Sequence, residues 1–314
     1  MRFNKALVTG GAGFIGSHIV DRLLDRGVEV LVLDDLSTGK MEHLHPRAVF
    51  VQGDVCDLNL VRKLVAEVDV VFHEAARVSI RQSVTEFHED AKVNLLGTLN
   101  VLEGISRSKR VKKLVYASSM AVYSEGGAAP LRENHSTDPV SPYGISKLAS
   151  EKYCLQIGAR FGVDTVILRY FNTFGWRQTL TPYVGVITIF INRVLAHQPP
   201  VIFGNGEQTR DFVFVGDVAT ANILAMESDL RNGIFNIGSG KGTSVNKIAQ
   251  LILTKLHSEL APVHAPPQPG EPKDSIADIA LSAQKLGYKP TVDLEEKIDD
   301  IINWWKNQPP GKRP

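Results

Sequence analysis

The chain has 314 residues, 43% of them hydrophobic, which is enough to bury one large core or two smaller ones. Its 35 Lys and Arg residues are balanced by 34 Asp and Glu residues, so no overall field would draw it to nucleic acid or to an anionic membrane. The two cysteines, Cys56 and Cys154, are too few for a disulfide framework and lack the paired spacing of a zinc site. We therefore expect a cytoplasmic protein with no metal site, membrane span or targeting segment.

Short β-branched runs alternate with helical patterns over residues 1–172. The runs are apolar on both faces, as strands of a parallel sheet must be when helices cover both sides. This pattern predicts a doubly wound parallel α/β sheet of the Rossmann type. The predicted strands are residues 6–9, 28–33, 48–51, 68–72, 114–117 and 163–168.

The pattern changes over residues 173–314, which we interpret as a smaller α/β substrate lobe. A loop is predicted over 176–183, helices over 184–196 and 294–306, and an extended segment over the proline-rich stretch 261–272. A buried strand at 233–237 suggests that the chain returns to the first lobe near residues 213–240.

The first predicted strand runs into the sequence GGAGFIG at residues 10–16 and then into an amphipathic helix. Gly10, Gly13 and Gly16 permit a tight turn, close approach to a pyrophosphate and close packing of helix on sheet, while the helix start supplies free N–H groups. Out of context, an ordinary glycine turn explains such a motif equally well. The acids that follow the next strands favour the dinucleotide interpretation.

The second predicted strand ends at Asp34, with Asp35 beside it, where an acid can accept the ribose hydroxyls of the adenosine half. Two carboxylates there would repel a 2′-phosphate, so the sequence predicts NAD rather than NADP. After the third strand, Asp54 could receive the adenine amino group. A helix-cap role is equally compatible, because Asp57 and Asn59 are also capping types.

The fourth strand closes with the sequence FHEAA at residues 72–76. The small side chains of Ala75 and Ala76 would let the backbone run under the pyrophosphate and the nicotinamide ribose. His73 and Glu74 suggest an acid/base pair, but adjacent strand residues point to opposite faces, so at most one faces the site. We assign neither to catalysis.

Ser141 and Pro142 start a predicted helix over 143–159 that carries Tyr143 and Lys147. Residues four apart share a helical face, so the phenol and the ammonium point into the same space. A free tyrosine is a poor base at neutral pH, but a neighbouring cation, aided by oxidised nicotinamide, would favour its phenolate. By spacing alone, a surface Tyr/Lys pair is the commoner explanation.

A serine pair at the carboxyl end of the fifth strand favours catalysis, because ligands of open α/β sheets bind outside those ends. Ser119 lies 24 residues before Tyr143 and could hydrogen-bond the substrate hydroxyl that the tyrosine deprotonates. Ser118 could be the residue that faces the site instead, and the sequence separates the two poorly.

Taken together, these segments resemble the extended short-chain dehydrogenase/reductase family, the NAD-dependent epimerases and dehydratases, and most closely its UDP-glucose (UDP-galactose) 4-epimerases. The resemblance covers nearly the whole chain and includes TGGAGFIG at 9–16, DDLSTG at 34–39, VNLLGT at 93–98, the serine pair, Tyr143 with Lys147, and LRYFN at 168–172. It implies that the tyrosine takes the proton of the sugar 4-hydroxyl while C4 delivers hydride to NAD. The 4-ketose then turns over, and hydride returns to its other face.

The patterns and the resemblance together give the candidate site. Catalysis is assigned to Tyr143, Lys147 and Ser119. Coenzyme binding is assigned to Gly10, Gly13, Phe14, Ile15, Gly16, Asp34, Asp35, Leu36, Ser37, Thr38, Gly39, Asp54, Val55, Ala75, Ala76, Asn94, Tyr143, Lys147 and Phe171. Substrate binding is assigned to Ser119, Asn172, Arg210, Phe212, Gln268, Glu271 and Ser275.

Three positions at which this chain differs from other members of the family indicate which reaction it catalyses. Related dehydratases and decarboxylases carry an acid directly after the catalytic Ser or Thr, whereas this chain has Met120 and Ala121, which disfavours elimination. Relatives that epimerise UDP-glucuronate tend to carry arginine near the position of Thr179, so the threonine favours a neutral hexose.

In the second lobe, Arg210 is the expected phosphate fork, with a solvated surface arginine as the alternative. Gln268 stands where the family usually has arginine, which weakens a second phosphate contact unless Lys273 or Arg177 compensates. Ser275 aligns with a bulky tyrosine of relatives restricted to UDP-glucose and UDP-galactose. Its small size predicts activity on UDP-GlcNAc and UDP-GalNAc as well.

Two other interpretations remain at this stage. One is another enzyme of the same scaffold, a glucuronate epimerase or a 4-ketoreductase. The other is a non-catalytic dinucleotide-binding protein, which usually loses the Tyr and Lys pair that this chain keeps. The resemblance also implies a homodimer built from the helices around Asn94 and Lys147.

Overall fold

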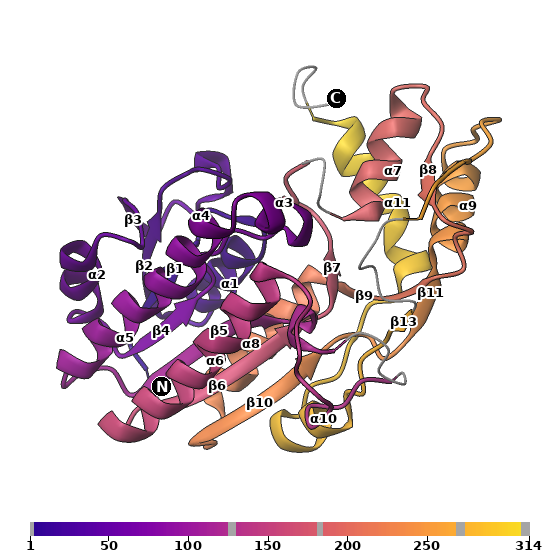
Figure 1. The fold of residues 1–314 in the computed structure, drawn as a ribbon. Coiled ribbons are helices and arrows are strands. Elements are labelled where there is room, and N and C mark those ends of the chain that lie inside the picture. Colours follow the sequence, from indigo (N-terminus) through magenta and orange to yellow (C-terminus); the bar gives the residue numbers. More distant parts are fainter. Residues whose placement is uncertain (1–2, 125–129, 181–184, 268–273, 309–314) are drawn as a thin grey trace.

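The structure is a computed structural model, which describes residues 3–124, 130–180, 185–267 and 274–308. In this part of the chain, seven parallel strands form one sheet in the order β10-β6-β5-β4-β1-β2-β3 (Figure 1). The predicted doubly wound parallel sheet is confirmed. Its strands are β1 (Lys5–Thr9), β2 (Glu29–Asp34), β3 (Val49–Gln52), β4 (Val70–His73), β5 (Lys113–Ser119), β6 (Asp164–Tyr170) and β10 (Asn232–Ile237).

Helices cover both faces of this sheet, and alternate strand residues pack under each layer. Ala6 and Val8 of β1 belong to the core beneath α1 (Phe14–Asp25) and α8 (Val215–Glu227). Leu7 belongs to the opposite core, beneath α2 (Leu58–Val65), α5 (Gly97–Arg107) and α6 (Pro142–Phe161). Because both faces are buried, the strand sequences are continuously apolar rather than alternating.

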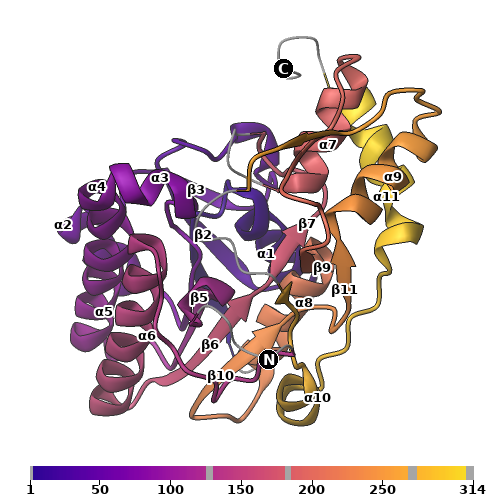
Figure 2. The ribbon, with the colours of Figure 1, turned by 45° about the vertical axis from the view of Figure 1, so that its right-hand side comes forward.

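The second lobe continues directly from the carboxyl end of β6, on the right of Figure 1. In its four-stranded sheet β9 (Thr209–Phe214) pairs with β7 (Asn172–Phe174), β11 (Gly242–Ser244) and β13 (Asp274–Ser275). A third core, formed with α7 (Val186–Leu195), α9 (Val245–Lys255) and α11 (Leu294–Lys306), lies beside these strands (Figure 2). The chain returns to the first sheet through α8 and β10.

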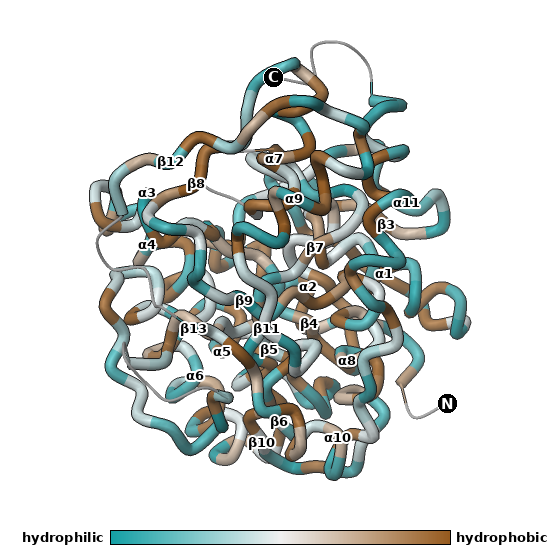
Figure 3. Tube along the Cα trace, turned by 90° about the vertical axis from the view of Figure 1, so that its right-hand side faces the viewer, coloured by the Kyte–Doolittle hydropathy of each residue, from teal (hydrophilic) through white to brown (hydrophobic). Residues whose placement is uncertain are grey.

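Shorter elements complete the described fold. They are the pair β8 (Val201–Phe203) and β12 (Val263–Ala265), helices α3 (Ile80–Thr85), α4 (Phe87–Ala91) and α10 (Ala280–Leu286), the π-helical turn Lys92–Leu96, and the 3₁₀ turns Met41–His43 and Met120–Val122. Teal and brown alternate along the outer helices in Figure 3, as expected for amphipathic segments. Among the described residues, no helix combines the length and apolarity that a bilayer crossing requires.

A buried ion pair fixes α6 against the sheet. Arg169 of β6 donates to both carboxylate oxygens of Glu151 of α6, at 2.9 and 2.7 Å, and both side chains are buried. Ser118 of β5 donates to the same carboxylate at 2.5 Å, and the Arg169 guanidinium stacks 4.8 Å from the ring centre of Tyr123. Either charge alone would be buried without compensation, so both side chains must be in place. The ion pair therefore fixes the position of α6 on β6.

Candidate active site

The glycine turn between β1 and α1 is held by contacts that leave no room for side chains. Gly10 has a φ of +70°, and a Cβ on Gly16 would lie 2.2 Å from the carbonyl oxygen of Gly10. Gly13 caps α1 without a side-chain hydrogen bond, so the amide groups of the first turn, at Phe14, Ile15 and Gly16, remain donors for a ligand. This cradle and its donors fit the pyrophosphate of a dinucleotide.

Asp34 ends β2 beside this turn. Its two carboxylate oxygens accept the amide N–H groups of Ala12 at 3.0 Å and of Leu36 at 2.8 Å. A carboxylate oxygen accepts more than one hydrogen bond, so each retains capacity for a ribose hydroxyl. Gly39 lets this carboxylate approach, because a Cβ there would lie 2.7 Å from its Oδ1. Burial raises the pKa of Asp34, and the Asp35 charge adds to the rise.

The loop after Asp34 is organised by Asp35, which is exposed. Its Oδ1 accepts both the amide and the hydroxyl of Ser37, at 2.9 and 2.7 Å. The carbonyl oxygen of Thr38 accepts the hydroxyl of Thr179 from the second lobe at 3.3 Å. The loop that would receive the adenosine ribose is therefore tied to both lobes.

Two further strand ends complete the predicted coenzyme groove. Asp54 is exposed and accepts the amide of Cys56 at 2.8 Å, whereas the cap of α2 is Asp57. Val55, next to Asp54, is buried. Ala75 donates its amide to Thr9 at 3.2 Å, which brings the segment with Ala76 alongside the glycine turn.

Tyr143, Lys147 and Ser119 meet at the carboxyl end of β5. Ser141 caps α6 by accepting the amide of Gly144 at 3.1 Å, and Pro142 follows in its first turn. The Ser119 hydroxyl lies near enough to the phenol of Tyr143 to lower its pKa. Lys147 donates to the carbonyl of Ala117 at 2.8 Å and is 3% exposed.

The electrostatics of this trio are set mainly by desolvation. Burial raises the pKa of Tyr143 to about 12, and the negative charges of Asp90 and Glu74 add to the rise, while the nearby Ser119 hydroxyl opposes it. Burial lowers the pKa of Lys147 to about 8, so its ammonium is still mostly protonated at neutral pH. Ionisation of Tyr143 at that pH therefore needs more positive charge than Lys147 brings.

The two serines of the pair separate in space. Ser118 points into the buried ion pair beneath α6, and Ser119 points to Tyr143. The alternation of strand side chains causes this difference, and the ion-pair partner of Ser118 comes from a distant helix.

Asn94 has a structural set of contacts. Its side-chain amide bonds both backbone groups of Arg77, at 2.9 and 3.0 Å, and the carboxylate of Asp90 at 2.9 Å. Its main-chain carbonyl, in the π-helical turn, accepts the hydroxyl of Ser150 of α6 at 3.0 Å. Asn94 thereby connects the segment after β4 to the helix that carries Tyr143.

The predicted substrate residues lie along β7, β9 and β13. Asn172 pairs with Phe212 across β7 and β9, and within the described residues its amide nitrogen has no hydrogen-bond partner. Arg210 donates to the carbonyl of Thr209 at 2.8 Å and pairs with Ser275 across β9 and β13. Ser275 is buried, and among the described residues its hydroxyl also lacks a partner.

The remaining predictions have different outcomes. Gln268, Glu271 and Lys273 lie outside the described residues. Arg177 forms an ion pair with Asp21 at 2.8 Å, and its compensation for Gln268 stays a prediction. Phe171 is buried, and its amide donates to Ile237 at 3.0 Å.

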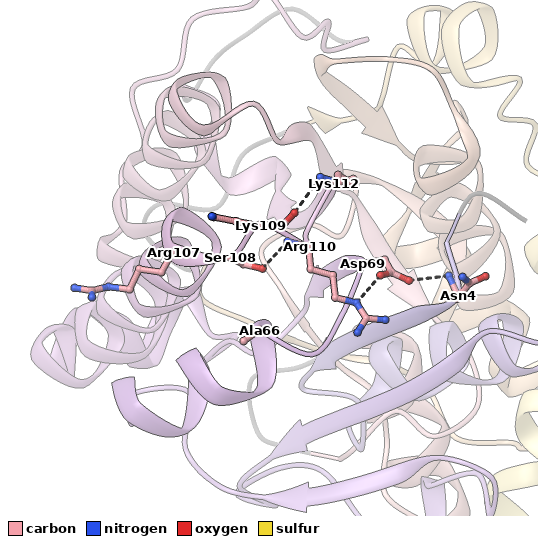
Figure 4. A pocket seen from close by; sticks show the side chains of 8 residues that line it. All are labelled: Asn4, Ala66, Asp69, Arg107, Ser108, Lys109, Arg110 and Lys112. Atoms are coloured by element: carbon pink, nitrogen blue, oxygen red, sulfur yellow. Dashed lines mark hydrogen bonds and ion pairs between the residues drawn. The ribbon is translucent and has the colours of Figure 1, made fainter.

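A surface concavity lies at the other end of the sheet (Figure 4). Asn4, Asp69 and Lys112, which line it, directly precede β1, β4 and β5. Asp69 accepts the Arg110 guanidinium at 2.8 Å and the Asn4 amide at 2.9 Å. This concavity is separate from the glycine turn, which is at the carboxyl ends of the strands. Among the described residues, no cluster of three His, Cys, Asp or Glu side chains is arranged to hold a metal ion.

The glycine turn, the acid after β2 and the buried Tyr and Lys pair define a dinucleotide-dependent enzyme of the Rossmann type. The sequence profile of the NAD dependent epimerase/dehydratase family matches residues 6–238. The chain belongs to this family, and its coenzyme is NAD.

Three relatives place the chain within the family. It is 45% identical over 303 residues to a putative UDP-glucose 4-epimerase of Methanocaldococcus jannaschii, covering 96% of this chain and 98% of the relative. The UDP-glucose 4-epimerase of Thermotoga maritima, solved with UDP-glucose, has a TM-score of 0.92 and 39% identity, covering 96% and 98%. A UDP-N-acetylglucosamine 4-epimerase of Methanobrevibacter ruminantium, solved with UDP-N-acetylmuramic acid, has a TM-score of 0.92 and 38% identity, covering 98% and 99%.

Two glycines of equal φ test the turn. Gly10→Ala adds a Cβ 2.7 Å from the amide nitrogen of Ala75, whereas Gly162→Ala, at a φ of +69°, meets nothing within 4 Å. Both variants bear left-handed strain of about 1 kcal/mol, and Gly10→Ala bears roughly 2 kcal/mol more from the close contact. Thermal unfolding should show a larger loss of stability for Gly10→Ala than for Gly162→Ala. NAD titration should show a loss of affinity in Gly10→Ala only. Equal NAD affinities in the two variants would contradict the assignment of the turn.

Proposed function

We propose that this enzyme interconverts UDP-glucose and UDP-galactose by inverting C4 through a 4-keto intermediate. The observation that carries the proposal is the buried Tyr143, which lies near the Ser119 hydroxyl and one helical turn from Lys147. The uncharged Met120 and Ala121 next to Ser119 favour simple return of the ketone over elimination. The names of the relatives support the same substrate class.

The residues of the trio have distinct roles in this proposal. Tyr143 takes the proton from the sugar 4-hydroxyl and gives it back after the ketone has turned over. Ser119 donates to the same sugar oxygen and holds it at the phenol. Lys147 stabilises the phenolate and, through the carbonyl of Ala117, fixes the angle at which α6 presents it. NAD, when bound, supplies the reversible acceptance of hydride from C4.

The sugar and its diphosphate are assigned to the second lobe. Asn172 offers a buried amide donor, and Arg210 a guanidinium suited to phosphate oxygens. We propose that residues 1–172, with the return segment near 213–240, form the coenzyme lobe and that residues 173–314 form the nucleotide-sugar lobe. The small buried Ser275 leads us to include UDP-GlcNAc and UDP-GalNAc among the substrates.

The enzyme is further proposed to act as a homodimer in carbohydrate metabolism. Large apolar side chains lie exposed on α3, α4, α6 and the π-helical turn. Monomeric proteins rarely expose a large group of apolar side chains together, so such a group indicates an interface. They are Ile80, Val84, Phe87, Leu96, Ile145 and Tyr153. These are the helices around Asn94 and Lys147, and a second copy of the chain is the proposed partner.

Replacement of Tyr143 by Phe tests the chemistry. The purified chain should convert UDP-galactose to UDP-glucose, and Tyr143→Phe should be slower by about 10³-fold because the proton acceptor is lost. The variant should still bind NAD and UDP-galactose in titrations. Activity restricted to UDP-glucuronate, net oxidation of added NADH, or full activity of the variant would each refute the proposal.

Ser275→Tyr tests the sugar range. The phenol would occupy the space proposed for the N-acetyl group, so conversion of UDP-GlcNAc should fall by about 100-fold while that of UDP-glucose changes little. Ser275→Ala, which removes the hydroxyl without filling space, should leave both sugars as substrates. Inactivity of the unaltered chain on UDP-GlcNAc would remove the argument from Ser275.

Ile145→Glu tests the dimer. A charge in a buried apolar interface carries a large desolvation cost, so sedimentation should show a monomer. Val263→Glu, an equally apolar and exposed position in β12 of the second lobe, should leave the dimer intact. An unaltered chain that sediments as a monomer would exclude this assembly.

A further inference from the structure

Glu74 is a carboxylate at the carboxyl end of β4 that the proposed reaction does not use. The preceding His73 turns to the α5 side, where it contacts the hydroxyls of Thr9 at 2.7 Å and Thr98 at 3.0 Å. Strand alternation sends Glu74 to the other side, where its Oε1 accepts the hydroxyl of Tyr170 at 3.0 Å.

The hydrogen-bond partner of Glu74 is neutral, and the positive group whose charge acts on its carboxyl is Lys147. Tyr170 in turn accepts the side-chain amide of Asn222 of α8 at 2.7 Å, and burial raises the pKa of its phenol well above the usual value. Within the described part of the chain, Glu74 accepts a hydrogen bond from Tyr170 and is half-buried. Burial raises the pKa of its carboxyl to about 7, and the Tyr170 hydrogen bond and the Lys147 charge oppose part of that rise.

The charge of Glu74 acts on the catalytic trio. It raises the pKa of Lys147 and that of Tyr143. The second effect opposes formation of the phenolate on which the proposed function depends. The Lys147 charge and the Tyr170 hydrogen bond offset only part of the burial cost of this carboxylate, so a further positive group placed beside it would be stabilised.

The backbone of Glu74 lies beside the coenzyme cradle. A Cβ on Gly10 would lie 3.0 Å from the carbonyl carbon of Glu74, and the amide of Glu74 donates to Thr9 at 3.2 Å. Glu74 thus adjoins the glycine turn, and its charge also acts on Tyr143. In the proposed reaction hydride and proton leave from the same sugar carbon and its oxygen, so the nicotinamide of a bound NAD would have to reach from the glycine turn toward Tyr143 and would pass near Glu74.

We propose that Glu74 selects the oxidised coenzyme: its carboxylate stabilises the positive nicotinamide ring of NAD and so makes the site bind NAD more tightly than NADH. The residue is a positioning group for charge and not a catalytic residue. This inference rests on the coenzyme and on Tyr143 as the base of the proposed function. It explains how an epimerase site, which must begin each cycle oxidised, retains a half-buried acid with a raised pKa.

Titration of the full-length chain with NAD and with NADH, at about pH 8.5 where Glu74 is ionised, tests the proposal. In Glu74→Gln, which keeps an acceptor for Tyr170 but loses the charge, the ratio of the NADH Kd to the NAD Kd should fall about tenfold. In Tyr170→Phe, which keeps the carboxylate, the ratio should stay within about twofold of the unaltered chain.

The ratio separates electrostatic selection from structural support. A structural role would change both affinities by the same factor, and an unchanged ratio in Glu74→Gln would overturn the proposal. Glu74→Ala should shift the ratio in the same direction and provides a second variant. No sugar is needed, so failure here is distinguishable from failure of the epimerase assay.

Thermal unfolding gives a second readout. The pKa of Glu74 is about 7 in the folded chain against an ordinary 4.5, so the folded state holds this proton more tightly. The stability linked to it is complete below about pH 4.5 and is lost as the pH rises through about 7. Glu74→Gln should therefore raise the Tm at about pH 8.5, and a lowered Tm there would contradict the buried-charge argument.

Discussion

The hydrogen bond from the Lys147 ammonium to the carbonyl of Ala117 is the constraint on which the site depends. It attaches α6 to the carboxyl end of β5, one residue before the serine pair. Tyr143, Lys147 and Glu151 are spaced four residues apart, so one face of α6 presents three polar groups to the sheet. Glu151 is held by Arg169 of β6 and Ser118 of β5, and these contacts fix the same position of α6 along the sheet. The position of the phenol beside Ser119 follows from these two anchors.

The surroundings of Tyr143 and Lys147 oppose the charged forms that the proposed reaction needs. Burial raises the pKa of Tyr143 to about 12 and lowers that of Lys147 to about 8, so both desolvation effects favour the neutral forms. Asp90 and Glu74 act in opposite senses on the two groups, opposing the phenolate and supporting the ammonium. Under the proposed function, Tyr143 acts as a base only when further positive charge is close, and this would couple proton removal to the presence of the oxidised coenzyme.

Local patterns were sufficient to predict the coenzyme lobe from the sequence. The strands are continuously apolar, GGAGFIG follows β1, and Ser141 with Pro142 starts α6, so each signal lies within a few residues of the element it defines. The spacing of Tyr143 and Lys147 placed both on one face of the helix, but their assignment to catalysis needed the serine pair after the fifth strand and the family resemblance. Long-range pairing was not accessible in this way: the choice between Ser118 and Ser119 depends on Glu151, and the path of Glu74 depends on Tyr170 and Asn222. The contacts of the Asn94 side chain to Arg77 and Asp90 are likewise long-range or depend on the π-helical turn, and its role in coenzyme binding stays a prediction.

The central claim is that the C4 hydrogen of the sugar leaves as hydride and returns to the same carbon. UDP-galactose carrying deuterium at C4 tests this claim most directly when it is incubated with the unaltered chain in ordinary water. The account predicts UDP-glucose that retains the deuterium at C4, as measured by mass spectrometry and proton NMR. Product with hydrogen at C4, and deuterium released to the solvent, would show that the hydrogen leaves as a proton and would contradict the account.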